Sequence, residues 1–339
     1  MRLPLFSSKH LGIDLGTSNS LVWSSGQGII ISEPSVVAQD AVTDKIVAVG
    51  TQAYEMLGRT GGDLIAKKPL RDGVIADYIA SQAMLKYFIE KSLGYSRFWG
   101  PIVMICVPYG ITQVERRAVL EASLSAGAKT AYLIDQPLAA AIGAKMPIDT
   151  PIGSMIVDIG GGQVGSAVIS LGGMVAAGGA RAGGDKLNEA IATYVRRIHN
   201  LVIGEKMAED IKLGVGSALK VTPVRKFEVK GRDAISGMPK TITIDSNEVT
   251  ESIQPVLLAI VASIKNVLEQ TPPELASDII DRGIVLTGGT SKLRGIDRFI
   301  SNQVGVSAHV WEDAMHAVVY GTGVALENID NWRKWVQTR

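Results

Sequence analysis

Two short turns that each begin with an aspartate carry the residue types from which a polyphosphate site can be built. The first reads Asp14-Leu15-Gly16-Thr17-Ser18-Asn19, and the second reads Asp158-Ile159-Gly160-Gly161-Gly162-Gln163. A short apolar stretch typical of a strand stands directly before each turn, and another stands directly after it. The glycines let backbone N–H groups approach an anion, and each aspartate can hold a hydrated Mg²⁺ ion. The repeat predicts two similar half-molecules that bind one polyphosphate between them.

A third glycine turn follows an apolar stretch late in the chain. Residues 283–287 are typical of a buried strand, and they lead into Gly288, Gly289, Thr290, Ser291 and Lys292. A nucleoside could lie against the bare backbone of this turn, because its two glycines have no Cβ. Taken in order, the two Asp-x-Gly turns and the late Gly-Gly turn resemble the superfamily of actin, DnaK-type chaperones and sugar kinases.

Further segments narrow the resemblance to the MreB family of bacterial actins over nearly the whole chain. These segments are Glu33-Pro34-Ser35-Val36-Val37, Asp72-Gly73-Val74-Ile75-Ala76-Asp77, Val114-Glu115-Arg116-Arg117-Ala118, Pro137-Leu138-Ala139-Ala140-Ala141-Ile142-Gly143-Ala144, Gly183-Gly184-Asp185 and Thr271-Pro272-Pro273-Glu274-Leu275. The resemblance implies an α/β fold, the actin-like ATPase fold, in which two related α/β domains surround a nucleotide cleft and each carries a smaller subdomain. The boundaries it implies are residues 1–33, 70–142 and 314–339 for the first large subdomain, 34–69 for the first small one, 143–184 and 248–313 for the second large one, and 185–247 for the second small one.

The same resemblance assigns roles at the cleft, with ATP and Mg²⁺ as the expected ligands. Residues 16–19 form the first phosphate loop, and residues 160–163 form the second. The segment Glu209-Asp210-Ile211-Lys212 contacts the ribose and the edge of the base, and residues 288–292 cover the adenine. Asp14 and Asp158 organise the magnesium ion and its waters, so they are expected to be both metal-binding and catalytic.

Two departures from the family pattern concern ATP hydrolysis. MreB proteins usually carry a glutamate that handles the attacking water at the position where this chain has Gln136. A glutamine cannot accept a proton as a carboxylate can, but it can orient water. The second turn continues Gln163-Val164-Gly165, whereas the family usually has Thr-Thr-Glu. One interpretation is neutral drift in which Gln163 substitutes for the usual threonine. The other, which we favour, is that ATP binding persists while turnover is slow.

Aromatic residues in an expected loop indicate contact with a membrane. Phe98 and Trp99 stand beside an arginine, and such a group suits the headgroup boundary of a bilayer. MreB proteins resemble this chain in having two apolar residues in the same loop, where they insert into the inner leaflet of the cytoplasmic membrane. Both termini add apolar residues that either reach the membrane or pack on their own domain. At the C-terminal end, Trp332, Trp335 and Val336 share one face of an expected helix.

Hydrophobic periodicity and cap residues predict the elements that position these turns. Apolar residues at a helical period predict helices over residues 75–90 and 253–268, the second ended by Pro272-Pro273. A buried strand is expected over residues 102–107. A helix with a capping box should open at Thr112, because Glu115 stands three residues further on. Another helix should begin near Asp185, and turns between strands are expected at residues 230–233 and 236–239.

Composition excludes several classes of protein. The chain has 34 basic and 33 acidic residues, and its net charge of +1 argues against a nucleic-acid partner. A single cysteine, Cys106, cannot form an internal disulfide, which fits a reducing, cytoplasmic compartment. The sequence has neither the Gly-Lys dipeptide of a P-loop nor a Gly-x-Ser-x-Gly elbow, and its four histidines lack the spacing of metal ligands. No apolar run approaches the roughly 18 residues that a membrane-spanning helix needs.

The resemblance therefore predicts an ATP-binding, membrane-associated filament protein that self-associates and maintains rod cell shape together with wall-synthesis proteins. An actin-like filament with slow turnover and another scaffolding role is an alternative. A small-molecule kinase of the same superfamily is a further alternative, but no unassigned aspartate stands in a motif for an acceptor base. A chaperone would need a substrate-binding domain after the nucleotide domain, and the chain stops at Arg339.

Overall fold

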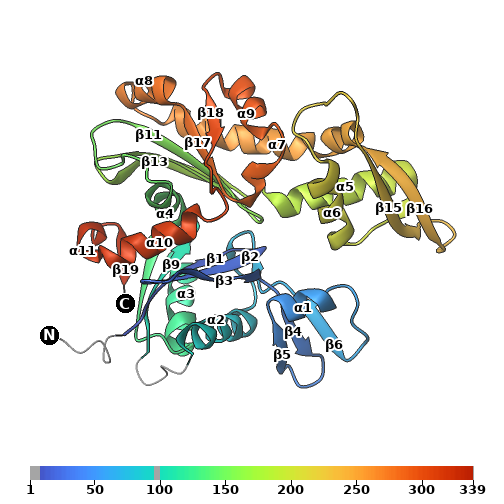
Figure 1. Ribbon diagram of the computed structural model, residues 1–339, viewed down its shortest axis with the longest axis horizontal. Helices are drawn as coiled ribbons and strands as arrows, with labels where there is room; N and C mark the ends of the chain where they lie inside the picture. Colours follow the sequence, from blue (N-terminus) through green and yellow to red (C-terminus); the bar gives the residue numbers. More distant parts are fainter. Residues whose placement is uncertain (1–7, 95–99, 339) are drawn as a thin grey trace.

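The first of two central sheets organises the N-terminal half of the chain (Figure 1). The computed structural model describes residues 8–94 and 100–338. The strand order in this sheet is β19 (Val336–Thr338), β10 (Thr130–Asp135), β9 (Ile102–Val107), β1 (His10–Leu15), β2 (Asn19–Ser24) and β3 (Gly28–Pro34). β1 and β2 form an antiparallel hairpin, and β9 lies parallel to β1 on its other side. The first Asp-x-Gly turn is therefore the connection of a central hairpin.

The second central sheet repeats this arrangement. Its strand order is β13 (Gly173–Ala180), β12 (Val164–Ser170), β11 (Ser154–Ile159), β17 (Ile284–Thr287) and β18 (Ala308–Val310). β11 and β12 form an antiparallel hairpin around the second Asp-x-Gly turn, and β17 lies parallel to β11. The two turns thus occupy equivalent places in two similar sheets, as the repeat in the sequence predicts.

Helices cover both sheets and fill the space between them. α2 (Tyr78–Leu93) and α3 (Gln113–Ser125) share a hydrophobic core with the strands of the first sheet. α4 (Gln136–Gly143) and α10 (Ala317–Glu327) contribute to a core that includes residues of both sheets, and Figure 1 shows them between the two halves. The second sheet packs with α5 (Gly184–His199), α7 (Ser246–Glu269), α8 (Pro273–Arg282) and α9 (Ile296–Val304).

Each half carries a smaller sheet. In the first half, β4 (Val37–Asp40), β5 (Ile46–Val49) and β6 (Leu64–Lys67) pack with α1 (Thr51–Met56). In the second, β14 (Leu201–Val202), β15 (Lys226–Asp233) and β16 (Pro239–Asp245) accompany α6 (Glu205–Val215). The remaining elements are a hairpin and two short helices. β7 (Leu70–Arg71) and β8 (Val74–Ile75) form the hairpin, and the helices are η2 (Gly289–Lys292) and α11 (Ile329–Trp332). The division into four subdomains at the boundaries given above stays a prediction.

Side-chain caps fix several helix starts where the sequence places them. The Thr112 backbone N–H donates to Glu115 Oε2 at 2.7 Å, and the Glu115 N–H donates to Thr112 Oγ1 at 3.2 Å, which completes the expected capping box of α3. α2 begins at Tyr78 rather than at residue 75, because Asp77 accepts from the Ala80 N–H at 3.0 Å and caps the helix there.

Two sequence predictions about local structure are wrong. Residues 230–233 were expected as a turn, but they continue β15, which pairs with β16 through Arg232 and turns only afterwards. The C-terminal residues Trp335 and Val336 were expected on a helix. α11 ends at Trp332, and Val336 begins β19, which pairs with β10. In both places the pairing with a strand decides the conformation, and the local pattern does not contain that information.

Among the described residues, α7 is the one helix that is long and apolar enough, by length and composition, to cross a membrane. The sequence was expected to contain no such segment, yet the most apolar 18-residue stretch of this helix has a mean hydropathy of 1.3. Val249, Ile253, Leu257 and Ile260 on one face of α7 are buried in the core of the second half. These contacts are those of a core helix, and core helices pass the same test.

Candidate functional site

A cavity of about 590 Å³ is lined by residues of both Asp-x-Gly turns. The late Gly-Gly turn borders the same cavity, so the structure brings together three segments that the sequence singled out. The expected site residues that line it are Asp14, Gly16, Thr17, Ser18, Asn19, Gln136, Asp158, Gly160, Gly161, Gly162, Gln163, Glu209, Lys212, Gly288, Gly289, Thr290 and Lys292. Its size is within the range of small-molecule and cofactor sites.

Three expected ligand contacts lie elsewhere. Ile211 is buried in the core of the second half, and Asp210 is exposed outside the cavity. Both belong to α6, where only one face can border the cavity, and Glu209 and Lys212 occupy that face. Ser291 is fully buried, and its hydroxyl donates to the Gly288 carbonyl at 2.7 Å, so it stabilises the turn itself.

The two Asp-x-Gly turns lie directly against each other. A Cβ added at Gly161 would stand 2.0 Å from Ser18 Oγ, and one at Gly162 would stand 2.4 Å from Thr17 Oγ1. Any larger residue at these positions would separate the two loops. Thr17 Oγ1 also accepts from the Gly73 N–H at 2.9 Å, which ties the first loop to the β7–β8 turn. The geometry leaves backbone groups of both loops facing the same cavity.

Two carboxylates, the buried Asp158 and the half-buried Asp14, lie at the bottom of this cavity. Burial raises the pKa of Asp14 to about 7, an effect that the Cys106 thiol opposes by donating to Oδ1 at 3.2 Å and that the charge of Asp158 increases. Burial likewise raises the pKa of Asp158 to about 6, opposed by hydrogen bonds from Thr287 Oγ1 at 2.8 Å and Gln136 Nε2 at 2.6 Å.

This pair of carboxylates fits a divalent cation. In the part of the chain that the structure describes, neither Asp14 nor Asp158 forms an ion pair with lysine or arginine. Two acids held close together without a compensating charge favour binding of Mg²⁺, which takes one or two carboxylates and keeps several waters. The described residues contain no cluster of three or more His, Cys, Asp or Glu side chains that could hold a metal ion by themselves.

Gln136 lies between the floor of the cavity and the second turn. It is the first residue of α4, and Pro137 follows it at a position that helix starts favour. Its amide nitrogen donates to Asp158, and its carbonyl oxygen Oε1 accepts from Gln163 Nε2 at 2.7 Å. The two glutamines that depart from the family pattern are therefore direct hydrogen-bond partners.

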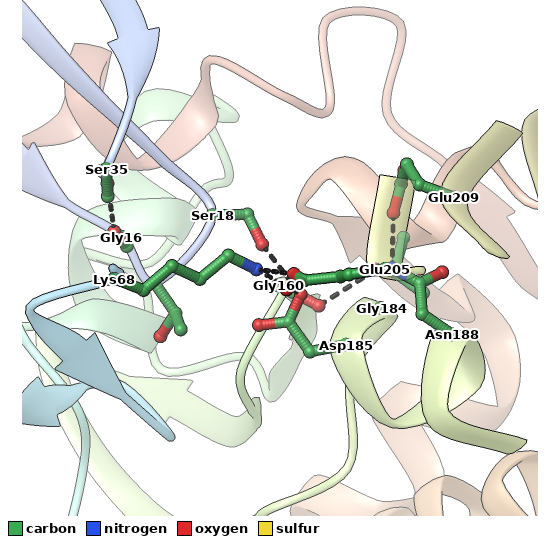
Figure 2. Close-up of polar contacts among 12 residues, drawn as sticks. Gly16, Ser18, Ser35, Lys68, Gly160, Gly184, Asp185, Asn188, Glu205 and Glu209 are labelled. Carbon is green, nitrogen blue, oxygen red and sulfur yellow. Dashed lines mark hydrogen bonds and ion pairs between the residues drawn. The ribbon is translucent and has the colours of Figure 1, made fainter. Parts of the chain in front are cut away.

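A lysine that the sequence did not single out bridges the two halves at the rim of the cavity. Figure 2 shows Lys68, between β6 and β7, directed toward Asp185 of α5 and Glu205 of α6. Its Nζ atom lies 3.0 Å from Asp185 Oδ1 and 2.5 Å from Glu205 Oε1. Ser18 Oγ donates to the same Asp185 oxygen at 3.2 Å. Nothing local in the sequence marks Lys68, because its partners follow more than one hundred residues later.

A second polar network borders the cavity beside the first (Figure 2). Lys212 Nζ donates to Glu209 Oε2 at 2.7 Å and to the Gly184 carbonyl at 3.2 Å. Asn188 Nδ2 donates to the same glutamate oxygen at 2.6 Å (Figure 2). Thr290 Oγ1 donates to the Gly160 carbonyl at 2.8 Å, which joins the late Gly-Gly turn to the second phosphate loop. These groups can recognise hydroxyls of a sugar and the edge of a base.

The expected membrane residues Phe98 and Trp99 lie outside the described residues. Of the other apolar residues considered for membrane contact, Trp332 and Val336 pack against the core between the two sheets. A Cβ at Gly173 would stand 2.5 Å from the Trp335 ring, so that tryptophan also lies against its own protein, although it is 41% exposed.

Two similar sheets, each with a hairpin whose Asp-x-Gly turn lines the same cavity, define an actin-like fold. The family model for the MreB/Mbl protein matches residues 8–334, and the chain belongs to this family. It is 49% identical over 329 residues to the cell shape-determining protein MreB of Escherichia coli, covering 95% of this chain and 94% of that protein. It is 46% identical over 327 residues to the cell shape-determining protein Mbl of Bacillus cereus, covering 96% and 98%.

Solved structures agree with this assignment. The structure of MreB5 of Spiroplasma citri bound to ADP matches with a TM-score of 0.91 and 34% identity, covering 97% of this chain and 98% of that one. A structure described as a MamK double helical filament matches with a TM-score of 0.78 at 23% identity, which supports the fold alone. The expected fold class and family are confirmed.

Proposed function

We propose that the protein binds ATP with Mg²⁺ in the cavity between its halves and assembles into filaments that maintain cell shape. The observation that carries the proposal is that both Asp-x-Gly turns and the Gly288-Gly289 turn line one cavity. Relatives named as cell shape-determining proteins support the cellular role. The Spiroplasma citri protein was solved with ADP and with AMPPNP, which supports a nucleotide as the ligand.

Within this proposal the residues divide by the part of the nucleotide that they face. Residues 16–19 and 160–163 bind the phosphates, Glu209 and Lys212 bind the sugar, and residues 288–290 with Lys292 lie along the base. Asp14 and Asp158 hold the magnesium ion through its waters, and the ion supplies charge neutralisation for the phosphates when bound. Gln136 orients the attacking water during hydrolysis, which we expect to be slow.

Calorimetric titration with Mg·ATP tests the site. Asp14→Ala and Asp158→Ala should each weaken binding by at least about tenfold, since each removes one carboxylate from the cation site. Asp281→Ala is a matched control, because Asp281 is exposed on α8 and is not among the residues that line the cavity. Wild-type affinity in both cavity variants would refute the assignment of the cleft.

Filament assembly on the inner leaflet of the cytoplasmic membrane completes the proposal, and Phe98 and Trp99 support it by their chemistry. One loop buries little apolar area, so a single subunit should bind weakly and a filament should bind tightly through many copies. Sedimentation with ATP, with ADP and without nucleotide, each with and without anionic liposomes, measures assembly and membrane binding separately. Replacing both Phe98 and Trp99 with Ser should abolish liposome binding and leave Mg·ATP binding unchanged. A double variant that still sediments with liposomes would exclude this loop as the anchor.

A further inference from the structure

A continuous chain of side-chain hydrogen bonds runs from β17 to the second phosphate loop. Thr287 Oγ1 donates to Asp158 Oδ1 at 2.8 Å, and Gln136 Nε2 donates to Asp158 Oδ2 at 2.6 Å. Gln163 Nε2 then donates to Gln136 Oε1 at 2.7 Å. Asp158 is 1% exposed, and both glutamines are half-buried at the cavity wall.

Asp158 determines the direction of every bond in this chain. An ionised carboxylate can only accept hydrogen bonds, so Gln136 must present its NH₂ group to Asp158. The carbonyl oxygen of Gln136 then faces Gln163, and Gln163 must in turn present its own NH₂ group. Both ends of the Gln136 amide are therefore used by protein partners in the one orientation that Asp158 permits.

Gln163 is held in place from the opposite half of the molecule. A Cβ added at Gly73, in the β7–β8 turn, would stand 2.7 Å from Gln163 Cδ and 2.9 Å from its Nε2. The same Cβ would stand 2.8 Å from Pro108 Cγ, so the turn and this proline close the space beside the amide. Gln163 therefore has little room to move away from Gln136 while the two halves lie together.

We propose that Gln163 is a positioning residue that holds Gln136 in an unproductive orientation and thereby slows ATP hydrolysis. This inference rests on the proposed function of the cleft. In hydrolysis a water oxygen bonds to the γ-phosphorus while the bond to the β–γ bridging oxygen breaks. ADP leaves with that electron pair, and the water's proton passes to phosphate or solvent.

Gln136 can assist this step only if its Oε1 atom turns to accept a hydrogen bond from the attacking water. That rotation breaks the bond from Gln163 and moves the NH₂ group away from Asp158. Removing the Gln163 bond should therefore raise the rate of hydrolysis about 3- to 10-fold, which corresponds to about 0.7–1.4 kcal/mol in the barrier. The effect should disappear when Gln136 is absent.

The experiment compares Gln163→Met and Gln163→Thr with wild type in the Gln136 and the Gln136→Ala backgrounds. Methionine keeps the length of the side chain and removes the amide, and threonine is the residue usual in the family. Phosphate release gives kcat and KM, and calorimetry with Mg·ATP gives affinity. The expected result is a raised kcat in both single variants and no rise in the Gln136→Ala background, and the calorimetric affinity separates any change in binding from the change in kcat.

A second readout needs no nucleotide. In protein labelled with ¹⁵N-glutamine, the Gln136 side-chain NH₂ resonances should shift in Gln163→Met, because its carbonyl loses a hydrogen-bond donor. Asp281→Asn, on exposed α8, should leave them unchanged. An unchanged or lower kcat in both Gln163 variants, or an equal rise in the Gln136→Ala background, would overturn the proposal. Loss of Mg·ATP binding in wild-type protein would instead refute the proposed function.

Discussion

Lys68 and Asp185 form an ion pair that connects the two halves of the molecule, with Nζ 3.0 Å from Oδ1. Burial disfavours the charged lysine, but Asp185 and Glu205 outweigh that effect and hold the pKa of Lys68 above its ordinary value. A second contact lies nearby, where Lys206 of α6 stands 5.6 Å from the centre of the Tyr54 ring of α1. The rim of the cavity is therefore closed by charged side chains from both halves.

Lys68→Ala should speed the release of bound nucleotide about 3- to 10-fold, because partly buried ion pairs of this kind contribute on the order of 1 kcal/mol. Lys67→Ala is a matched control, since Lys67 pairs with Asp77 at 2.7 Å within the same half. Displacement of a fluorescent ATP analogue in a stopped-flow instrument measures both rates. Equal release from the two variants would show that the Lys68 ion pairs do not hold the cleft closed.

The nucleotide-free protein should lose stability as the pH rises from about 4 to about 7. The carboxyls of Asp14 and Asp158 release their protons near pH 3.8 in the unfolded chain, but only near pH 7 and pH 6 in the folded protein. Between these values the folded protein binds more protons than the unfolded chain, so the free energy of unfolding falls with pH. The stabilising contribution is fully present below pH 3.8 and is lost once both groups ionise.

Calorimetric melting at pH 5 and pH 8, with a chelator and without nucleotide, measures this loss. Asp14→Asn should show a smaller fall in Tm between the two pH values than wild type, whereas the exposed control Asp281→Asn should show the wild-type fall. Added Mg²⁺ should recover part of the loss at pH 8, because a cation neutralises the pair. A fall of the same size in Asp14→Asn and wild type would contradict this account.

The sequence predicts best where a feature is local or repeated. The two Asp-x-Gly hairpins, the capping box at Thr112 and the strand at residues 102–107 all depend on neighbours in the chain, and the structure has each of them. Contacts between distant segments are not encoded in this way. The Lys68–Asp185 pair spans 117 positions, and only the fold brings the two together.

Two differences between the sequence-based expectations and the structure arise from contacts between distant segments. Trp332, Trp335 and Val336 repeat at helical spacing, but the pairing of Val336 with Ile134 of β10 imposes a strand. The segment 209–212 was treated as one contact surface, whereas a helix turns successive side chains by about 100° each and sends Ile211 into the core. The helix itself could be predicted from the sequence, but the direction from which the cavity approaches it could not.

Gln136→Ala should slow phosphate release, because it removes the amide that orients water whenever the hydrogen bond from Gln163 opens. Gln136→Glu places a second carboxylate where Nε2 now stands, 2.6 Å from Asp158 Oδ2. Without Mg²⁺ this variant should therefore melt at a lower temperature than wild type at pH 8, and Mg²⁺ should reduce the difference. Single-turnover phosphate release and calorimetry check the two effects separately. Release from Gln136→Ala at the wild-type rate would exclude a role for this side chain in positioning water.

Gln136→Glu alone should accelerate hydrolysis less than the triple variant Gln136→Glu/Gln163→Thr/Val164→Thr. In the single variant Gln163 would donate to a carboxylate, and a charge-assisted hydrogen bond is stronger than one between two amides. The triple variant removes that bond and supplies two hydroxyls. We therefore expect a rise of about 10- to 100-fold over wild type, at or below the lower end of the roughly 10²–10⁴-fold range for a general base, because phosphoryl transfer depends more on positioning than on proton removal. Phosphate release at saturating Mg·ATP measures the three rates. A single variant as fast as the triple one would show that Gln163 does not restrain residue 136.

Gly73→Ala should disturb the contact between Gln163 and Gln136, because Gly73 lies beside Gln163 in the other half of the molecule. Gly73 has φ +81°, a backbone conformation that side chains other than glycine rarely adopt, and the added Cβ would meet Gln163 Cδ at 2.7 Å. We expect a loss of about 1–3 kcal/mol in the free energy of unfolding, from backbone strain and displacement of the Gln163 amide. Gly58→Ala is a matched control, because Gly58 has φ +70° but nothing within 4 Å of its Cβ position. Denaturant unfolding of both variants separates the two contributions: the control reports the strain alone, and the excess loss in Gly73→Ala reports the contacts with Gln163 and Pro108. Equal losses in the two variants would show that the β7–β8 turn does not press on Gln163.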